Sequence, residues 1–196
     1  AGLEQDTSEE LVKRFKSAYV RWEENSFPGL LGNVIAGRVA NRLNLGGTNC
    51  VVDAACGSSL AAMKMAISEL REGRCDVMLT GGVDTDNSPF MYMCFSKTPA
   101  FTKRDQVQPF DKNSEGIMIG EGLGLVVLKR LEDAVRDGDR IYAKIIGVGS
   151  SSDGRFKSIY APREEGQVLA IQRAQTDANI ENLSLIHISE PTRHES

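Results

Sequence analysis

Short apolar segments alternate with helical segments along most of this chain, and this alternation constrains the fold more than any other feature. The sequence predicts strands over residues 48–53 and 75–84, then a strand, a helix and a further strand within residues 120–154. Apolar strands of about four to eight residues that alternate with helices are typical of layered α/β domains. We therefore expect an α/β fold. The 196 residues match one domain of ordinary size or part of a larger one.

Three further segments have the spacing of helices. Residues 7–24 repeat apolar side chains at helical intervals, and Thr7 with Glu10 has the pattern of a capping box. Residues 30–47 predict a second helix that ends at a pair of glycines, and residues 163–180 predict the last helix.

A single cysteine stands between a β-branched run and a long apolar run in the segment 51–70. Ala55 and Gly57 on either side of Cys56 leave room for a sharp turn, and the helix predicted over Leu60–Leu70 is apolar on nearly all sides, which is typical of a buried helix. A helix N-terminus stabilises a thiolate, and a backbone N–H there can donate to a developing oxyanion. These residues alone leave two interpretations of Cys56 open: a nucleophile, or a small inert core residue.

The other three cysteines are interpreted as structural. Cys50 begins a predicted strand, Cys75 follows a helix stop, and Cys94 lies in the aromatic and sulfur-rich patch 89–95, within the segment 85–115 that we expect to be irregular. None of the four forms a Cys-x-x-Cys pair or has a histidine at metal-ligand spacing, so we expect neither a metal site nor a disulfide framework.

Charge and hydropathy exclude several classes of protein. The formal net charge is −4, so no broad basic surface is available for nucleic acid or an anionic membrane. No apolar run approaches the length of a membrane span, and the first residues lack the pattern of a signal peptide. These features favour a cytoplasmic location.

Other candidate motifs point to no chemistry. The glycine-rich segment 120–124 precedes a strand rather than opening a helix, so it does not fit a dinucleotide-binding loop. His187 and His194 lie in residues 182–196, whose character differs from the rest of the chain, and we expect neither to be a catalytic base. The remaining carboxylates are too scattered to indicate an acid–base pair. They are Asp53, Asp84, Asp86, Asp111, Glu115 and Glu121.

Three segments, in order, resemble the β-ketoacyl synthases. "DAACGSSLAA" (53–62) is similar to the active-site segment of that family, "PFDKNSEGIMIGEGLGLVVLKRLEDA" (109–134) to its Gly-Glu-Gly strand and following helix, and "GVGSSSDGRFKSIYAPREEGQ" (147–167) to its next strand and Asp-Gly loop. The resemblance runs from about residue 15 to about residue 181. The strings at 17–42, 46–50 and 85–102 are most similar to the ketosynthase of multidomain polyunsaturated fatty acid synthases, with type I polyketide synthases next.

The resemblance implies a fold and a reaction. The fold would be the thiolase-like layered α/β/α fold, of which this chain holds the N-terminal half, and the family works as a homodimer. The reaction would be a decarboxylative Claisen condensation, with substrates carried on the phosphopantetheine of acyl carrier protein and with no cofactor or metal bound directly. Cys56 would be the nucleophile that becomes acylated, its backbone N–H would bind the oxyanion, and Phe95 would line the acyl pocket. Met91 and Met93 lie in the same region, where core packing is the simpler interpretation.

The chain also departs from the family pattern. The family's His-Gly-Thr-Gly-Thr, Lys-Ser-Asn-x-Gly-His and Gly-Phe-Gly-Gly segments are absent. We therefore interpret residues 1–181 as a partial ketosynthase domain, and residues 182–196, which resemble a translated sequencing adapter, as a chimeric tail. Three functional hypotheses stay open: a ketosynthase domain that is inactive as this chain alone, a non-catalytic fragment prone to association, and a thiolase-like coenzyme A acyltransferase.

Overall fold

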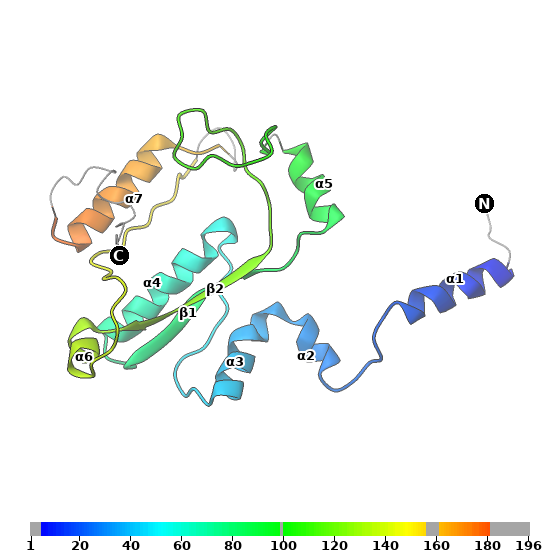
Figure 1. Cartoon of the computed structure of the whole chain (residues 1–196), viewed down its shortest axis with the longest axis horizontal. Coiled ribbons are helices and arrows are strands. Elements are labelled where there is room, and N and C mark those ends of the chain that lie inside the picture. Colours follow the sequence, from blue (N-terminus) through cyan, green and yellow to red (C-terminus); the bar gives the residue numbers. More distant parts are fainter. Residues whose placement is uncertain (1–4, 99, 156–160, 181–196) are drawn as a thin grey trace, which may run out of the picture. The chain divides into compact units, whose positions relative to one another are not determined.

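A computed structural model of the chain describes residues 5–98, 100–155 and 161–180. The elements in chain order are α1 (Gln5–Ser17), α2 (Ser26–Leu30), the 3-10 turn η1 (Gly32–Val34), α3 (Ile35–Leu43), the 3-10 turn η2 (Ala55–Gly57), α4 (Ser58–Arg71), β1 (Val77–Asp84), α5 (Pro89–Lys97), β2 (Gly122–Lys129), α6 (Leu131–Arg136) and α7 (Glu164–Asp177) (Figure 1). They confirm the expected mixture of helices and strands.

The chain divides into two compact units. The first comprises the described residues up to Met63 together with Gly81–Leu125, and the second comprises Lys64–Thr80 with the described residues from Val126 on. Because each unit is built from two separate stretches of sequence, the chain passes between them several times, and α4 contributes residues to both.

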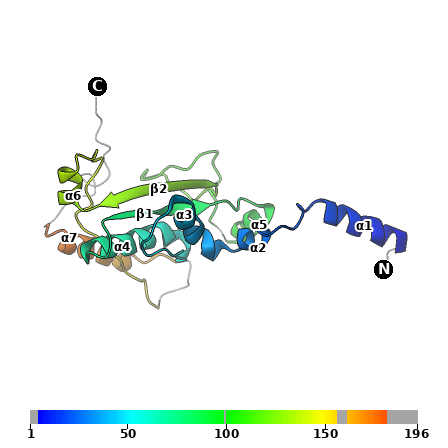
Figure 2. The ribbon, with the colours of Figure 1, turned by 90° about the horizontal axis from the view of Figure 1, so that it is seen from below.

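β1 and β2 pair into a two-stranded sheet, and they run in opposite directions (Figure 2). Both strands match their predicted positions. Gly81 permits a close approach, since a Cβ atom there would lie 2.0 Å from the carbonyl oxygen of Gly124. β2 leaves much of its apolar surface in solvent, with Leu123 77% exposed and Val127 68% exposed.

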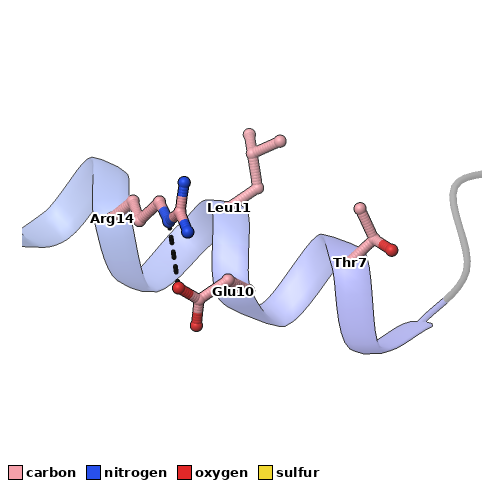
Figure 3. A pocket seen from close by; sticks show the side chains of 4 residues that line it. All are labelled: Thr7, Glu10, Leu11 and Arg14. Atoms are coloured by element: carbon pink, nitrogen blue, oxygen red, sulfur yellow. Dashed lines mark hydrogen bonds and ion pairs between the residues drawn. The ribbon is translucent and has the colours of Figure 1, made fainter.

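The first predicted helix is shorter than its apolar pattern. α1 ends at Ser17, whereas the spacing predicted a helix to residue 24. The predicted capping box is wrong, because the helix begins before Thr7. Glu10 instead accepts a hydrogen bond from Nε of Arg14 at 2.9 Å, one turn further along the helix (Figure 3). Thr7, Glu10, Leu11 and Arg14 line a surface hollow formed by α1 side chains alone.

The second helix, predicted over residues 30–47, forms as η1 and α3, and α2 precedes it. It ends earlier than its glycine pair predicted, because Asn44 takes the left-handed conformation with φ 53° and closes the helix with hydrogen bonds to Ala40 and Asn41. Asparagine is one of the few residues other than glycine that visits this conformation readily. The stop signal was therefore a local asparagine rather than Gly46 or Gly47.

Two predicted strands do not form among the described residues. Residues 48–53 have no regular secondary structure, because a segment becomes a strand only when another strand satisfies its backbone groups. The strand predicted after α6 is replaced by a segment that packs on α7. Cβ atoms at Gly147 and Gly149 would lie 2.3 Å and 2.0 Å from carbonyl oxygens of that helix. Helix contact, rather than strand pairing, fixes this segment.

The helix that follows Cys56 is buried on one side only, so the prediction of a fully buried helix is wrong. Ala66 and Leu70 are buried, whereas Leu60 is 69% exposed. The apolar pattern of the helix shows that its side chains can pack against other elements. The described residues cover only some of these side chains.

The segment 85–115, predicted to be irregular, contains the helix α5. Ser88 caps it by accepting a hydrogen bond from the backbone N–H of Met91, and Pro89 occupies the first helical turn, where its missing N–H costs nothing. The Ser-Pro pair is a helix-start signal. The helix was not predicted because the aromatic and methionine residues that follow this pair are apolar all round the helix and form no separate apolar face.

Buried residues in the described part of the chain are few and small. They are Ala40, Ala66, Leu70 and Ala134, with the polar Thr80 and Asp133 and with Gly166. Within the same part of the chain, no helix has the length and apolar character that crossing a membrane requires.

Candidate active site

Cys56 lies in the tight turn η2, which ends at Gly57, the residue before α4. It is exposed to solvent. The preceding residue, Ala55, has φ 48°, which is the left-handed region. That conformation costs an L-residue roughly 1–2 kcal/mol, so the surrounding contacts must maintain it. The backbone N–H of Gly57 donates to the carbonyl oxygen of Ala54 at 3.0 Å and closes the turn.

Two side chains hold the turn. The hydroxyl of Ser58 accepts from the backbone N–H of Ala54 at 2.9 Å and donates to the carbonyl oxygen of Ala55 at 2.7 Å. Asp53 accepts from the backbone N–H of Ala55 at 3.1 Å. Three successive peptide groups before the cysteine thus have side-chain partners, which offset the strain at Ala55.

The first turn of α4 lies against β1. A Cβ atom at Gly82 would approach Cβ of Ser59 to 3.0 Å, so the absence of a side chain at Gly82 permits this contact. The strand therefore supports the helix start three residues beyond Cys56.

The position of Cys56 suits nucleophilic chemistry. Backbone N–H groups in a first helical turn lack intrahelical acceptors, and the dipole of the 14-residue α4 favours negative charge at that end. A backbone N–H at such a helix start is the kind of group that donates to an oxyanion, so this geometry is compatible with the role predicted for Cys56. The predicted sharp turn forms at Cys56, and its thiol is exposed. The exposure contradicts the alternative of a buried core cysteine, whereas the role of nucleophile stays a prediction.

Phe95 lies on α5 in a small aromatic cluster. Its ring centroid is 6.0 Å from that of Phe101, and the ring of Tyr92 is 5.4 Å from Phe101. Phe101 is fixed by a parallel bridge to Ile117. Phe95 is half-buried there. Its expected place beside an acyl chain stays a prediction, as does the role of Met91 and Met93.

The other cysteines are less buried than a structural role predicts. Cys50 and Cys94 are exposed, and Cys75 is partly exposed, so none of the three is a core residue in this structure. All four thiols are free. Among the described residues, no cluster of histidine, cysteine and carboxylate side chains could hold a metal ion.

Two carboxylates treated as scattered in the sequence have defined positions. Asp53 caps the turn before Cys56, and Glu121 accepts a hydrogen bond from the backbone N–H of Asn87 at 2.9 Å, which joins the start of β2 to the segment before α5. Ser58 was not singled out from the sequence, because its place in a run of small residues gives no signal of its hydrogen-bond partners. His187 and His194 lie outside the described residues.

The densest charge cluster belongs to the second unit and surrounds α6. Arg130 bonds Asp133 at 2.6 Å, the carbonyl oxygen of Cys75 at 2.7 Å and Asp76 at 2.5 Å. Arg136 and then Lys129 lower the pKa of Asp137 to about 2 by donating hydrogen bonds to the carboxylate. These groups pair with each other and with backbone, so their arrangement is structural.

Burial and ion pairing act in opposite directions on Asp133 in this cluster. Desolvation raises its pKa, but the hydrogen bonds from Arg136 and Arg130 outweigh that effect and leave the pKa below its usual value. Asp133 therefore stays ionised although its side chain is buried.

Comparison with known proteins identifies the family. The family model "Beta-ketoacyl synthase, N-terminal domain" matches residues 1–134. The chain belongs to the β-ketoacyl synthase family, as the motifs around Cys56 predicted.

The curated relatives are large synthases. The chain is 51% identical over 180 residues to a polyunsaturated fatty acid synthase subunit of Thraustochytrium sp., a match that covers 92% of this chain and 6% of that protein. It is 38% identical over 149 residues to a phenolphthiocerol/phthiocerol polyketide synthase subunit of Mycobacterium tuberculosis, covering 76% of this chain and 8% of that protein. The chain thus spans only a small part of the length of the curated relatives it matches.

Solved structures agree with this assignment. A PfaC keto synthase–chain length factor superposes with a TM-score of 0.72 at 41% identity, over 78% of this chain and 16% of that one. The ketosynthase complex described as "type II PKS acyl-carrier protein in complex with its ketosynthase bound to the hexaketide" also gives a TM-score of 0.72, at 24% identity, over 81% of this chain and 40% of that one, and supports the fold alone. The thiolase-like α/β fold is confirmed.

Proposed function

We propose that this chain carries the acyl-accepting half of a β-ketoacyl-[acyl carrier protein] synthase. One observation carries the proposal: Cys56 is an exposed thiol on a side-chain-held turn at the start of α4, in a chain of the ketosynthase family. An exposed thiol at a helix N-terminus is the environment in which cysteines react as nucleophiles.

The first step is transfer of an acyl group. The Cys56 thiolate attacks the thioester carbonyl carbon, a carbon–sulfur bond forms, and the carbonyl electrons move to oxygen, where the Cys56 N–H stabilises the charge. Collapse of this intermediate breaks the bond to the phosphopantetheine sulfur, which leaves as a thiolate and is protonated by solvent. The product is an acyl-enzyme.

The second step is condensation. Malonyl carrier protein loses carbon dioxide, and the resulting carbanion attacks the acyl group on Cys56, which forms the 3-oxoacyl product and restores the thiolate. The residues 5–98, 100–155 and 161–180 contain no histidine. We therefore assign the decarboxylation to groups outside the described residues, and assign to these residues only the acyl transfer.

The substrates and partner follow from the relatives. The similarity to polyunsaturated fatty acid and polyketide synthases supports a role in fatty acid or polyketide biosynthesis, with substrates on the phosphopantetheine of an acyl carrier protein and no cofactor bound directly. A homodimeric, cytoplasmic enzyme is part of the same proposal. Phe95 would contact the acyl chain, because α5 offers aromatic and methionine side chains that are only partly covered.

A second candidate, that this chain alone is non-catalytic, is favoured by its exposed apolar surface. Phe110 is 95% exposed, Leu123 77% and Val127 68%. Monomeric proteins rarely leave so many large apolar side chains in water, because burying each would stabilise the fold by roughly 1.5–3 kcal/mol. On this proposal residues 1–181 need further protein surface to complete the domain.

One experiment tests both candidates. The purified chain is incubated with octanoyl-N-acetylcysteamine, and the adduct is mapped by mass spectrometry, while release of carbon dioxide from malonyl carrier protein is followed in parallel. We expect an octanoyl adduct on Cys56 and no decarboxylation. Labelling at another residue, or no labelling, contradicts the acyl-transfer assignment. Decarboxylation by the chain contradicts the second candidate, and transfer from coenzyme A thioesters with none from carrier protein revives thiolase-like chemistry.

A further inference from the structure

The turn before Cys56 is held by a serine that the reaction itself does not use. Ser58 is partly exposed, and its hydroxyl bridges two backbone groups: it accepts from the N–H of Ala54 at 2.9 Å and donates to the carbonyl oxygen of Ala55 at 2.7 Å. A serine hydroxyl has one proton to donate and lone pairs to accept, so both bonds form at once.

The carbonyl of Ala55 and the N–H of Cys56 belong to the same peptide group. That group is planar and trans, so the direction of the carbonyl fixes the direction of the N–H. By binding the Ala55 oxygen, Ser58 therefore also orients the N–H that the proposed acyl transfer uses for the oxyanion. Asp53 cannot replace it, because Asp53 bonds the N–H of Ala55, which belongs to the preceding peptide group.

The conformation of Ala55 makes this support necessary. Its φ of 48° is disfavoured for an alanine, so the unsupported turn would relax toward a common backbone conformation and rotate the peptide group between Ala55 and Cys56. The thiol, which lies beyond that peptide on the helix start, depends on it less.

We propose that Ser58 is a positioning residue that orients the Cys56 N–H as an oxyanion donor. This inference rests on the proposed acyl transfer to Cys56. It implies that loss of the Ser58 hydroxyl affects reactions that build an oxyanion and spares reactions of the same thiol that do not.

Two reagents separate these reactions. Acylation by octanoyl-N-acetylcysteamine passes through a tetrahedral oxyanion, whereas alkylation by iodoacetamide forms a carbon–sulfur bond as iodide leaves, with no oxyanion. In Ser58→Ala of the full chain we expect acylation of Cys56 to slow about 10- to 100-fold, since removing an oxyanion donor outright costs about 10²- to 10³-fold. Alkylation should change by less than about threefold, as for a thiol whose surroundings are little altered.

Two further variants serve as controls. Ser58→Thr keeps the hydroxyl and should restore acylation. Ser59→Ala is the matched control, because no hydrogen bond of its hydroxyl is seen within the described residues, and it should leave both rates within about twofold. Circular dichroism melting of each variant shows whether it is folded.

The outcomes discriminate. Slower acylation with unchanged alkylation supports the positioning role. Equal loss of both rates, or loss of neither, overturns it and leaves the acyl-transfer proposal intact. Absence of a Cys56 adduct in the unaltered chain overturns the proposed function and this inference with it.

Discussion

The two ends of α4 are held in different ways. At its N-terminal end, Cys56 is exposed, and its turn is fixed by hydrogen bonds among residues 53–58. At its C-terminal end, Ala66 and Leu70 are 2% and 5% exposed, and Arg71 forms a bidentate pair with Asp177 at 3.0 Å, more than 100 residues along the chain. Local bonds thus set the geometry of the end that carries Cys56, while burial and distant contacts anchor the other end.

This difference separates the accessibility of the Cys56 thiol from the stability of the helix that follows it. An exposed thiol is accessible to a substrate, but its surroundings contribute little hydrophobic stabilisation, because that contribution scales with the apolar area removed from water. Contacts at the far end of the helix can stabilise it without blocking the thiol. Lys64, on the same helix as Ala66, adds to that anchorage with a hydrogen bond from its ammonium group to the hydroxyl of Ser150 at 2.7 Å.

The largest expected effect is at the Cys56 end of α4. Cys56→Ser should lower the rate of octanoyl transfer at least about a thousandfold, because a serine without a general base is a weak nucleophile. The free energy of unfolding should hardly change, since the side chain is exposed. Mass spectrometry of the acylated chain and urea denaturation provide the two measurements.

Cys94→Ser is the matched control for this change, since Cys94 is also an exposed free thiol. It should retain the rate of transfer. A Cys94 variant that loses acylation while the Cys56 variant keeps it would reverse the assignment.

The next effect is at the anchored end. Leu70→Ala should lower the free energy of unfolding by about 3 kcal/mol, as truncation of a buried leucine generally does. Leu60→Ala on the same helix, where the side chain is 69% exposed, should cost less than about 0.5 kcal/mol. Urea denaturation measures both, and similar losses for the two leucines would show that the helix is not anchored at one end.

A smaller effect tests the acyl pocket. Phe95→Ala should slow octanoyl transfer roughly tenfold relative to acetyl transfer, because an apolar wall discriminates by the methylene groups it contacts. Phe90→Ala, on the same helix but 70% exposed, should leave the ratio of the two rates unchanged. Competition between the two thioesters measures this ratio directly. A constant ratio in the Phe95 variant would remove Phe95 from the pocket.

The smallest effect concerns the charge cluster around α6. The folded pKa of Asp137 is depressed to about 2 by Arg136 and Lys129, so its ion pairs stabilise the fold above the ordinary carboxyl pKa. That contribution should decline as the pH falls from about 4 and be lost below about 2.

Asp137→Asn should flatten the dependence of the melting temperature on pH in this window, as followed by circular dichroism. The acylation rate at neutral pH should be unaffected, which is the control. An unchanged slope would show that Asp137 is not paired in solution.

The sequence predicted the turn at Cys56 and the helix after it better than it predicted several other elements. Cys56, the small residues beside it and the following helix form a continuous stretch, and local backbone preferences act over that range. β1, β2 and α7 were also predicted, since the two strands are short apolar runs and the helix has apolar residues at helical spacing. Ser58 was missed because a serine in a run of small residues gives no sign of which backbone groups it will bind.

Other predictions were wrong where contacts between distant parts of the sequence decide the secondary structure or the burial of a residue. Residues 48–53 and the segment after α6 have the composition of strands, but a strand requires a paired neighbour, and the second segment packs on α7 through Gly147 and Gly149 instead. The apolar pattern of α4 likewise could not show that Ala66 and Leu70 would be buried while Leu60 remained exposed.

The sequence by itself therefore determined the family, the fold class and the identity of the candidate nucleophile, because these depend on ordered motifs and on local turn chemistry. Only the tertiary structure decided that Cys56 is exposed, that Ala55 is left-handed, and that Ser58 holds the peptide between them. The physical reason is that exposure and hydrogen-bond partners are properties of the folded arrangement, which a residue's own identity does not contain.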